Sequence, residues 1–200
     1  WPMGGRMDAY PAYGQNAPAE AALAMRHADG NLSTELEATG VERLKNDGNQ
    51  ITVIHLKDKV YPVTVDLKFQ EYKDVDMIET WAEITHQEKG TVTLTQFASV
   101  SLPIRRGDVW LSHLYGSWAN EGQLVCEPLT AGQKIIKNKD GVRNAHTDHA
   151  EVMFSLDGRA QELTGDVIGA ALCYSGNYQL KVETDDTDYH YFFAGINPDN

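Results

Sequence analysis

The chain has 200 residues, of which 42% are hydrophobic, so it can bury a core and is too apolar to be disordered throughout. Its 29 Asp and Glu against 17 Lys and Arg give a formal net charge of −12. This charge argues against nucleic acid or an anionic membrane surface as a partner, because both attract basic proteins, and it is compatible with a neutral ligand such as a sugar.

The first segment with a clear pattern is residues 16–28, which favours two structures at once. An early proline and many alanines are typical of a helix, whereas Leu23, Met25 and His27 alternate toward the turn signal Asp29-Gly30. Alternation continues beyond that turn through residues 32–36. We therefore expect a β-hairpin here, with a helix as the alternative.

From residue 50 onward the dominant signal is a period of two, which indicates half-buried strands. Further strands are expected at intervals of about 8–15 residues, without long helical patterns between them. The expected strands are 50–56, 61–69, 77–85, 91–97, 109–115, 123–128, 151–156, 167–174, 178–183 and 189–193.

Turn-forming residues separate these strands. The turn signals are Asp47-Gly48, Lys89-Gly90, Arg106-Gly107-Asp108, Asp140-Gly141, Asp157-Gly158 and Ser175-Gly176-Asn177. This spacing predicts an all-β antiparallel sandwich or barrel rather than alternating strands and helices.

Three polar clusters contain residue types that could carry chemistry. The segment 144–149 has two histidines and an aspartate that could bind zinc, but no distant fourth ligand stands out, so a polar loop is the preferred interpretation. The segment 185–188 lacks the glycine and distal glutamate of a calcium loop and is expected to be an acidic turn. Arg106-Gly107-Asp108 matches an adhesion tripeptide, but it also fits a hairpin turn. Paired catalytic carboxylates cannot be chosen among 29 acidic residues.

The aromatic residues suggest surfaces that could contact a sugar or a partner. Trp81 lies inside an alternating strand, so a core position is expected. Trp110 and Trp118 flank the point where the strand pattern breaks at Tyr115-Gly116-Ser117, which makes an interface or substrate-facing role plausible for both.

Neither the cysteines nor the start of the chain fixes the compartment. Cys126 and Cys173 could form one bridge or stay reduced. Residues 1–5 lack a signal-peptide pattern and do not begin with Met, so the start is expected to be trimmed, and both cytoplasm and periplasm remain open.

Several segments in order resemble the N-terminal domain of glycoside hydrolase family 36, the microbial α-galactosidases. Leu114–Glu121 resembles the family motif Leu-x-Gly-x-Trp-x-x-Glu, and Ile136–Asn144 is similar to a run that precedes a His-bearing loop. Leu172–Tyr178 is similar to a Tyr-Ser-Gly-Asn-Phe hairpin, Ala194–Pro198 to a Gly-Ile-Asn-Pro sequence, and Tyr10–Gly14 to an early Tyr-Gly segment. The resemblance covers the chain from about Tyr10 to Asn200.

This resemblance implies a large antiparallel β-supersandwich, with residues 1–200 as a single domain. In the family, a (β/α)8 barrel follows and carries two catalytic Asp residues for retaining hydrolysis of α-galactosides. No catalytic residue, metal or other cofactor is expected in this chain. Its partners would be its own barrel, other subunits of a homo-oligomer and a carbohydrate substrate.

The residues expected at the substrate rim or barrel interface are Tyr13, Trp110, Trp118, Asn144 and His146. Two departures limit what the resemblance implies for them. The family's Gly-Asp-Phe-Arg segment is absent after Gly14, which leaves that sugar contact unassigned. The family's His-x-x-Asn-Pro-Phe loop matches only at His146. An independent carbohydrate-binding sandwich is the alternative function, and an adhesion domain is a third.

Overall fold

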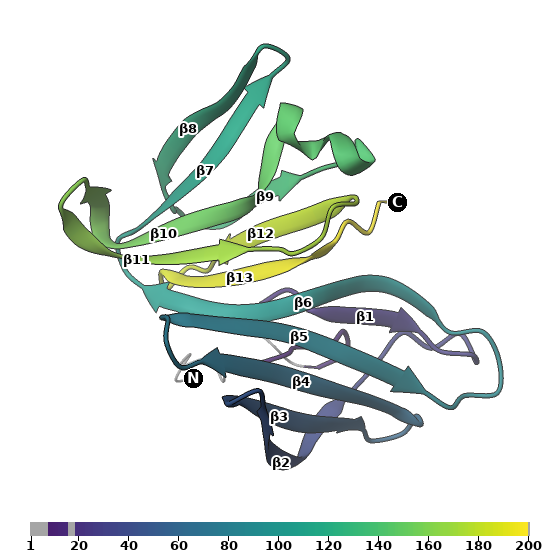
Figure 1. Cartoon of the computed structure of the whole chain (residues 1–200). Helices are drawn as coiled ribbons and strands as arrows, with labels where there is room; N and C mark the ends of the chain where they lie inside the picture. Colours follow the sequence, from purple (N-terminus) through teal and green to yellow (C-terminus); the bar gives the residue numbers. More distant parts are fainter. Residues whose placement is uncertain (1–7, 16–18, 200) are drawn as a thin grey trace. The chain divides into compact units, whose positions relative to one another are not determined.

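The computed structural model describes residues 8–15 and 19–199, and within these ranges the side chains of residues 105, 106 and 143–145 are left undescribed. The described residues form strands almost exclusively, with one short 3-10 helix (Figure 1). Every ladder between these strands is antiparallel. The all-β antiparallel prediction is therefore confirmed.

The chain divides into two compact units, Trp1–Val100 and Ser101–Asn200. Strand β6 crosses the division, so its last residues belong to the second unit. The prediction that residues 1–200 form one domain stays a prediction.

Unit 1 contains a four-stranded sheet in the order β2-β3-β4-β5 and a ladder between β1 and β6. The bounds are β1 Leu23–Arg26, β2 Leu36–Asn46, β3 Asn49–Asp58, β4 Val63–Tyr72, β5 Met77–His86 and β6 Thr93–Arg106. Both sets of strands contribute to the core, and the buried apolar side chains include Leu23, Met25, Val63, Val65, Leu67 and Ala98.

Unit 2 contains a four-stranded sheet in the order β11-β10-β7-β8 and a ladder of β13, β12 and β9. The bounds are β7 Val109–Ser117, β8 Asn120–Pro128, β9 Gly132–Lys137, η1 Gly141–His146, β10 Asp148–Gln161, β11 Thr164–Ala171, β12 Tyr178–Thr184 and β13 Tyr189–Ile196. Phe154 of β10 meets Phe192 of β13 edge to face at 5.2 Å between ring centroids, so an aromatic contact joins the two sets of strands.

The turn chemistry explains most of the hairpins. Asp47 and Gly48 both have positive φ, 46° and 82°, which is the type I′ geometry that a two-residue loop between β2 and β3 requires. At the acidic turn, the Asp185 carboxylate accepts hydrogen bonds from the N–H groups of Thr187 and Tyr189 and from the Thr187 hydroxyl. The carboxylate thus caps the turn between β12 and β13, as the acidic-turn interpretation predicted.

Two expectations about local structure need correction. Leu23–Arg26 is a strand, and His27–Gly30 is a turn, but residues 31–35 form no return strand, because β1 pairs with β6 instead. Residues 16–18 of that segment lie outside the described residues. Asp157-Gly158 does not separate two strands, since β10 continues to Gln161 and the pair forms a bulge in which Gly158 N–H donates to the Asp108 carbonyl.

Strands β2 and β9 were not predicted, and the core position predicted for Trp81 was wrong. Trp81 is half-buried; its indole N–H donates to Glu83 Oε1 at 3.1 Å, and the Lys68 ammonium lies 5.9 Å from its ring centroid. The two cysteines are free, with Cys126 half-buried and Cys173 exposed.

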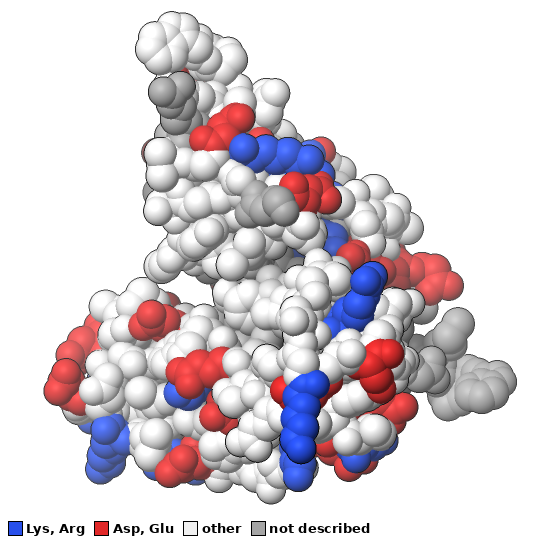
Figure 2. Space-filling model, turned by 90° about the vertical axis from the view of Figure 1, so that its right-hand side faces the viewer, with Lys and Arg blue, Asp and Glu red and all other residues white. Residues whose placement is uncertain are grey.

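Charges of both signs are dispersed over one face of the molecule (Figure 2). On the face shown in Figure 2, Lys and Arg side chains stand among Asp and Glu and do not gather into one basic patch. None of the described helical segments is long and apolar enough to cross a membrane.

Candidate functional site

Two of the predicted site residues come together in unit 2. Trp118 lies in the two-residue turn between β7 and β8, and His146 ends the 3-10 helix η1. Their rings meet at 5.3 Å between centroids with an interplanar angle of 44°. The Trp118 side chain is nevertheless largely open, because the residue is 80% exposed.

Glu121 completes this group, which we call the Trp118 cluster: Trp118, Glu121 and His146. The Glu121 carboxylate accepts the Ala119 N–H at 3.0 Å, and its Oε1 lies 3.3 Å from His146 Nδ1. Hydrogen bonds from the backbone N–H groups of Glu121 and Ala119, and then the interaction with His146, lower the pKa of the Glu121 carboxyl. Glu121 was not predicted as a site residue, although it is the last position of the Leu114–Glu121 motif.

The β7–β8 turn has a backbone shape that few residues allow. A Cβ placed on Gly116 would lie 2.5 Å from the Asn120 carbonyl oxygen. The backbone of β8 therefore comes so close to position 116 that only glycine fits there. Ala119 has a φ of 62°, which is uncommon for a residue with a Cβ. The motif glycine therefore sets where the chain turns, and this turn presents the Trp118 ring outward.

The helix η1 is anchored by Asn138, a buried residue of the Ile136–Asn144 segment. Its side-chain amide donates to the carbonyls of Gly141 and Gly176 at 2.6 and 3.2 Å. Its backbone carbonyl accepts a hydrogen bond from the Asn197 amide at 3.1 Å, and Asn177 Oδ1 accepts the Gly141 N–H at 2.7 Å. Three motifs that lie far apart in the sequence therefore meet at one buried asparagine.

The other predicted site residues do not join the cluster in the described structure. Trp110 is half-buried at the start of β7, where its indole N–H donates to Asp108. Trp118 comes eight positions later, after the end of the extended strand β7, which places it roughly 26 Å away. Tyr13 is 53% exposed in unit 1, where its N–H donates to the Leu23 carbonyl and its carbonyl accepts the Thr34 N–H. The Asn144 side chain lies outside the described residues.

The side chains of segment 144–149 that the structure describes are those of residues 146–149. Among the side chains that the structure describes, no group of three or more His, Cys, Asp or Glu is placed to hold a metal ion. Asp148 instead lies where burial raises the pKa of its carboxyl, although His113 and Lys134 act in the opposite direction.

The Trp118 cluster has the chemistry of a binding surface rather than of a hydrolytic centre. It offers one aromatic face, one ionised carboxylate and one imidazole. Retaining hydrolysis of a glycoside needs two carboxyl groups about 5–5.5 Å apart, and the cluster has one. An exposed indole on a turn of defined backbone shape is suited to packing against a protein partner or the apolar face of a sugar ring.

Comparisons with known proteins identify the family and the fold of this chain. Residues 3–200 match the profile of the glycosyl hydrolase family 36 N-terminal domain. Alpha-galactosidase Mel36A of Lactobacillus acidophilus is 28% identical over 156 residues, which cover 78% of this chain and 21% of that protein. Probable alpha-galactosidase C of Aspergillus terreus is 25% identical over 73% of this chain and 19% of its own length.

The solved structures include the family 36 α-galactosidase AgaA of Geobacillus stearothermophilus. It superimposes with a TM-score of 0.88 at 22% identity, covering 94% of this chain and 28% of that one. This likeness confirms the expected fold class, a large antiparallel β-supersandwich. The chain thus spans only 19% to 28% of the length of these three proteins.

Proposed function

This chain belongs to the family of glycosyl hydrolase family 36 N-terminal domains, and we propose that it acts as the accessory domain of an α-galactosidase. In this proposal the complete enzyme hydrolyses terminal α-galactosides in oligosaccharides with retention of configuration. Its two catalytic carboxylates belong to a (β/α)8 barrel that follows this domain. The domain itself shapes the rim of the active site and contributes to an oligomer interface.

The observation that carries the proposal is the exposed Trp118 ring. A tryptophan that is 80% exposed leaves most of a large apolar surface in water, which is unfavourable unless a partner or ligand covers it. Gly116 and the Glu121–Ala119 hydrogen bond hold the turn that carries it. Because this backbone is already ordered, covering the ring costs less conformational freedom than ordering a loose loop would.

The neighbours of Trp118 suit a rim that contacts both protein and sugar. The Glu121 carboxylate can accept hydrogen bonds from sugar hydroxyl groups, and His146 can donate or accept them. The chain's net charge of −12 does not repel a neutral galactoside. We assign the contact with the barrel, or with the barrel of a neighbouring subunit, to Trp118 and His146, and Tyr13, Trp110 and Asn144 remain candidates for the same interface.

The first experiment is to determine the native coding sequence beyond Asn200. The proposal predicts several hundred further residues with a repeating strand–helix pattern and an Asp at the end of a barrel strand. The encoded full-length protein should hydrolyse melibiose and raffinose. NMR spectra recorded during the reaction should show the α-anomer of galactose as the first product, before it equilibrates with the β-anomer. A coding sequence that stops near Asn200 would reject the proposal and would favour an independent carbohydrate-binding module.

A further inference from the structure

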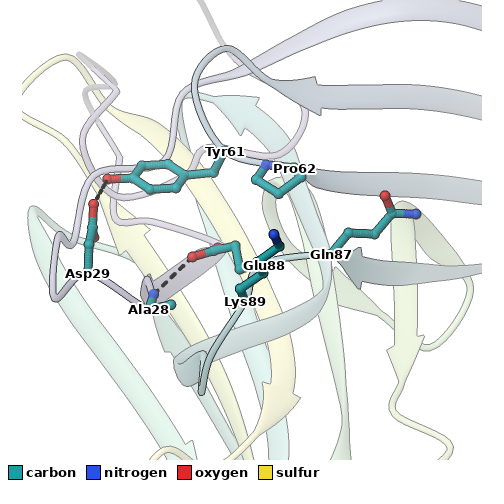
Figure 3. Close-up of a pocket in the computed structure, with 7 residues that line it drawn as sticks. All are labelled: Ala28, Asp29, Tyr61, Pro62, Gln87, Glu88 and Lys89. Atoms are coloured by element: carbon teal, nitrogen blue, oxygen red, sulfur yellow. Dashed lines mark hydrogen bonds between the residues drawn. The ribbon is translucent and has the colours of Figure 1, made fainter.

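Unit 1 carries an open pocket of about 480 Å³ that contains none of the residues predicted to form a site (Figure 3). It lies where three connections meet: the turn after β1, the β3–β4 loop and the β5–β6 loop. Its lining residues include Asp29, Tyr61, Pro62, Gln87, Glu88 and Lys89. The volume falls within the range of about 300–1,000 Å³ that is usual for small-molecule sites.

The aromatic wall of this pocket is held in place at two points. The Tyr61 ring stacks on His27, with centroids 3.6 Å apart and planes within 10°. Its hydroxyl donates to Asp29 Oδ2 at 2.8 Å and accepts a hydrogen bond from the Asn31 amide at 2.8 Å. The ring therefore has a fixed orientation before any ligand arrives, which reduces the entropy lost on binding.

The second wall of the pocket is Glu88, whose two carboxylate oxygens contact His27 and the Ala28 N–H. Glu88 Oε1 lies 2.7 Å from Nδ1 of His27, whose side chain is fully buried, and Oε2 accepts the Ala28 N–H at 2.9 Å. His27 Nε2 lies 3.1 Å from the Ser33 carbonyl oxygen and 3.0 Å from Thr34 Oγ1. The two ring nitrogens of His27 thus lie within hydrogen-bond distance of the Glu88 carboxylate on one side and of the Ser33 carbonyl and Thr34 hydroxyl on the other.

This arrangement keeps Glu88 ionised. Burial by itself raises the pKa of the Glu88 carboxyl, but the hydrogen bonds from His27 and Ala28 outweigh burial and leave this pKa below its usual value. The Glu88 carboxylate is therefore negatively charged near neutral pH.

The remaining polar groups offer both donors and acceptors. Asp29 is an acceptor whose pKa is lowered by the Asn31 N–H and the Tyr61 hydroxyl. Lys89 is a donor of opposite charge, and the Gln87 amide can do both. Lys89 offsets one of the two lining carboxylates, Asp29 and Glu88, so groups of both signs line the pocket.

We propose that this pocket binds one unit of a neutral saccharide, with its apolar C–H face against Tyr61 and Pro62 and its hydroxyl groups on Asp29, Gln87 and Lys89. An aromatic wall beside several hydrogen-bond donors and acceptors matches the two-sided chemistry of a pyranose ring. The site is distinct from the Trp118 cluster, which belongs to the other unit. It therefore goes beyond the proposed rim function and does not depend on it.

The test is a titration of the 200-residue chain with galactose, melibiose and raffinose to about 20 mM, a range suited to millimolar affinities. Amide chemical shifts should identify where each sugar binds, and we expect the largest changes at the lining residues of unit 1. Gln87→Ala and Lys89→Ala should each weaken binding at least about threefold, the loss of roughly one hydrogen bond. Both residues are exposed, so neither variant should change the melting temperature.

Two controls distinguish this pocket from a second binding surface and from an ion site. Leu163→Ala, at a residue that is 92% exposed and belongs to neither site, should leave the titration unchanged. Sugar-induced shifts confined to the Trp118 cluster, with none at the lining residues of unit 1, would show that the sugar sits at that cluster and that the proposal is wrong. Glucosamine and galacturonate carry a positive and a negative charge on similar rings. Tighter binding of either by about tenfold or more would show an ion-selective site and reject a neutral saccharide. No shift with any sugar at the highest concentration also rejects the proposal.

Discussion

Trp118→Ala separates a role in folding from a role in assembly or substrate binding. A tryptophan side chain covers about 150–250 Å² when buried, and Trp118 leaves 80% of its surface in water. At about 25 cal/mol per Å², covering that surface would contribute on the order of 4 kcal/mol to an interface. The isolated domain loses almost none of this on truncation, so its free energy of unfolding should change by about 0.5 kcal/mol or less.

The assay compares the isolated domain with the full-length enzyme. We expect the melting temperature of the isolated domain to stay within about 2 °C, while kcat/KM for raffinose or the subunit association constant of the enzyme falls by about 30-fold or more. Leu163→Ala is the matched control, because Leu163 is 92% exposed in the β10–β11 turn and belongs to no proposed site. A Trp118→Ala enzyme that keeps both its kcat/KM and its assembly within twofold of the parent would refute the reasoning.

Three further predictions concern stability. Tyr10→Phe should lower the free energy of unfolding, measured by chemical denaturation, by about 1–2 kcal/mol. The reason is that the buried Tyr10 hydroxyl donates to the Ala98 carbonyl at 2.7 Å, and the variant leaves this oxygen without that donor; an unchanged free energy would mean that the bond is not formed. Asn138→Ala should lower it by about 2–3 kcal/mol and shift the amide resonances of η1, whereas an unaltered η1 spectrum would contradict the anchoring role of this residue. Burial raises the pKa of the Asp148 carboxyl in the folded state above 3.8, its value in the unfolded chain. The protonated carboxyl therefore stabilises the fold at low pH, and this contribution is lost as the pH rises through the folded-state pKa. Asp148→Asn should therefore melt at a higher temperature than the parent at pH 7, with the difference shrinking at pH 4; the opposite trend would exclude burial as the cause.

The strands that sequence patterning did not predict had weak signals for identifiable reasons. Strand β2 reads Leu-Glu-Ala-Thr-Gly-Val-Glu-Arg-Leu-Lys-Asn, and all but its first residue are exposed, so it lacks the alternation that a half-buried strand requires. Strand β9 has six residues and flanks a polar loop. Each is defined by pairing with a neighbour rather than by its own residues.

Local signals were also ambiguous where several residues allow two structures. Residues 19–28 have helical propensity but contain a strand, because pairing with β6 decides the outcome. Asp157 and Gly158 both have positive φ, as in a hairpin turn. They instead form a bulge, because the Asp108 carbonyl accepts the Gly158 N–H and the strand continues past them.

The candidate site likewise contains residues that the sequence indicated and contacts that only the fold decides. Trp118 and His146 could be named from the sequence, because motif residues at recognisable spacing indicated where the strand pattern breaks. Their contact with each other and with Glu121 depends on the register of the β7–β8 hairpin and on the position of η1. No sequence pattern singles out Asn138, because its importance arises only from partners up to 59 residues away.

By itself, then, the sequence determined the all-β class, the tight turn at Asp47-Gly48 where both residues have positive φ, and the family, because each of these rests on short patterns along the chain. The tertiary structure alone decided which side chains converge. The stacking of Tyr61 on His27, and the pairing of His27 with Glu88, join residues 34 and 61 positions apart. Such contacts depend on strand order and loop paths, and no local pattern of residues specifies either of them.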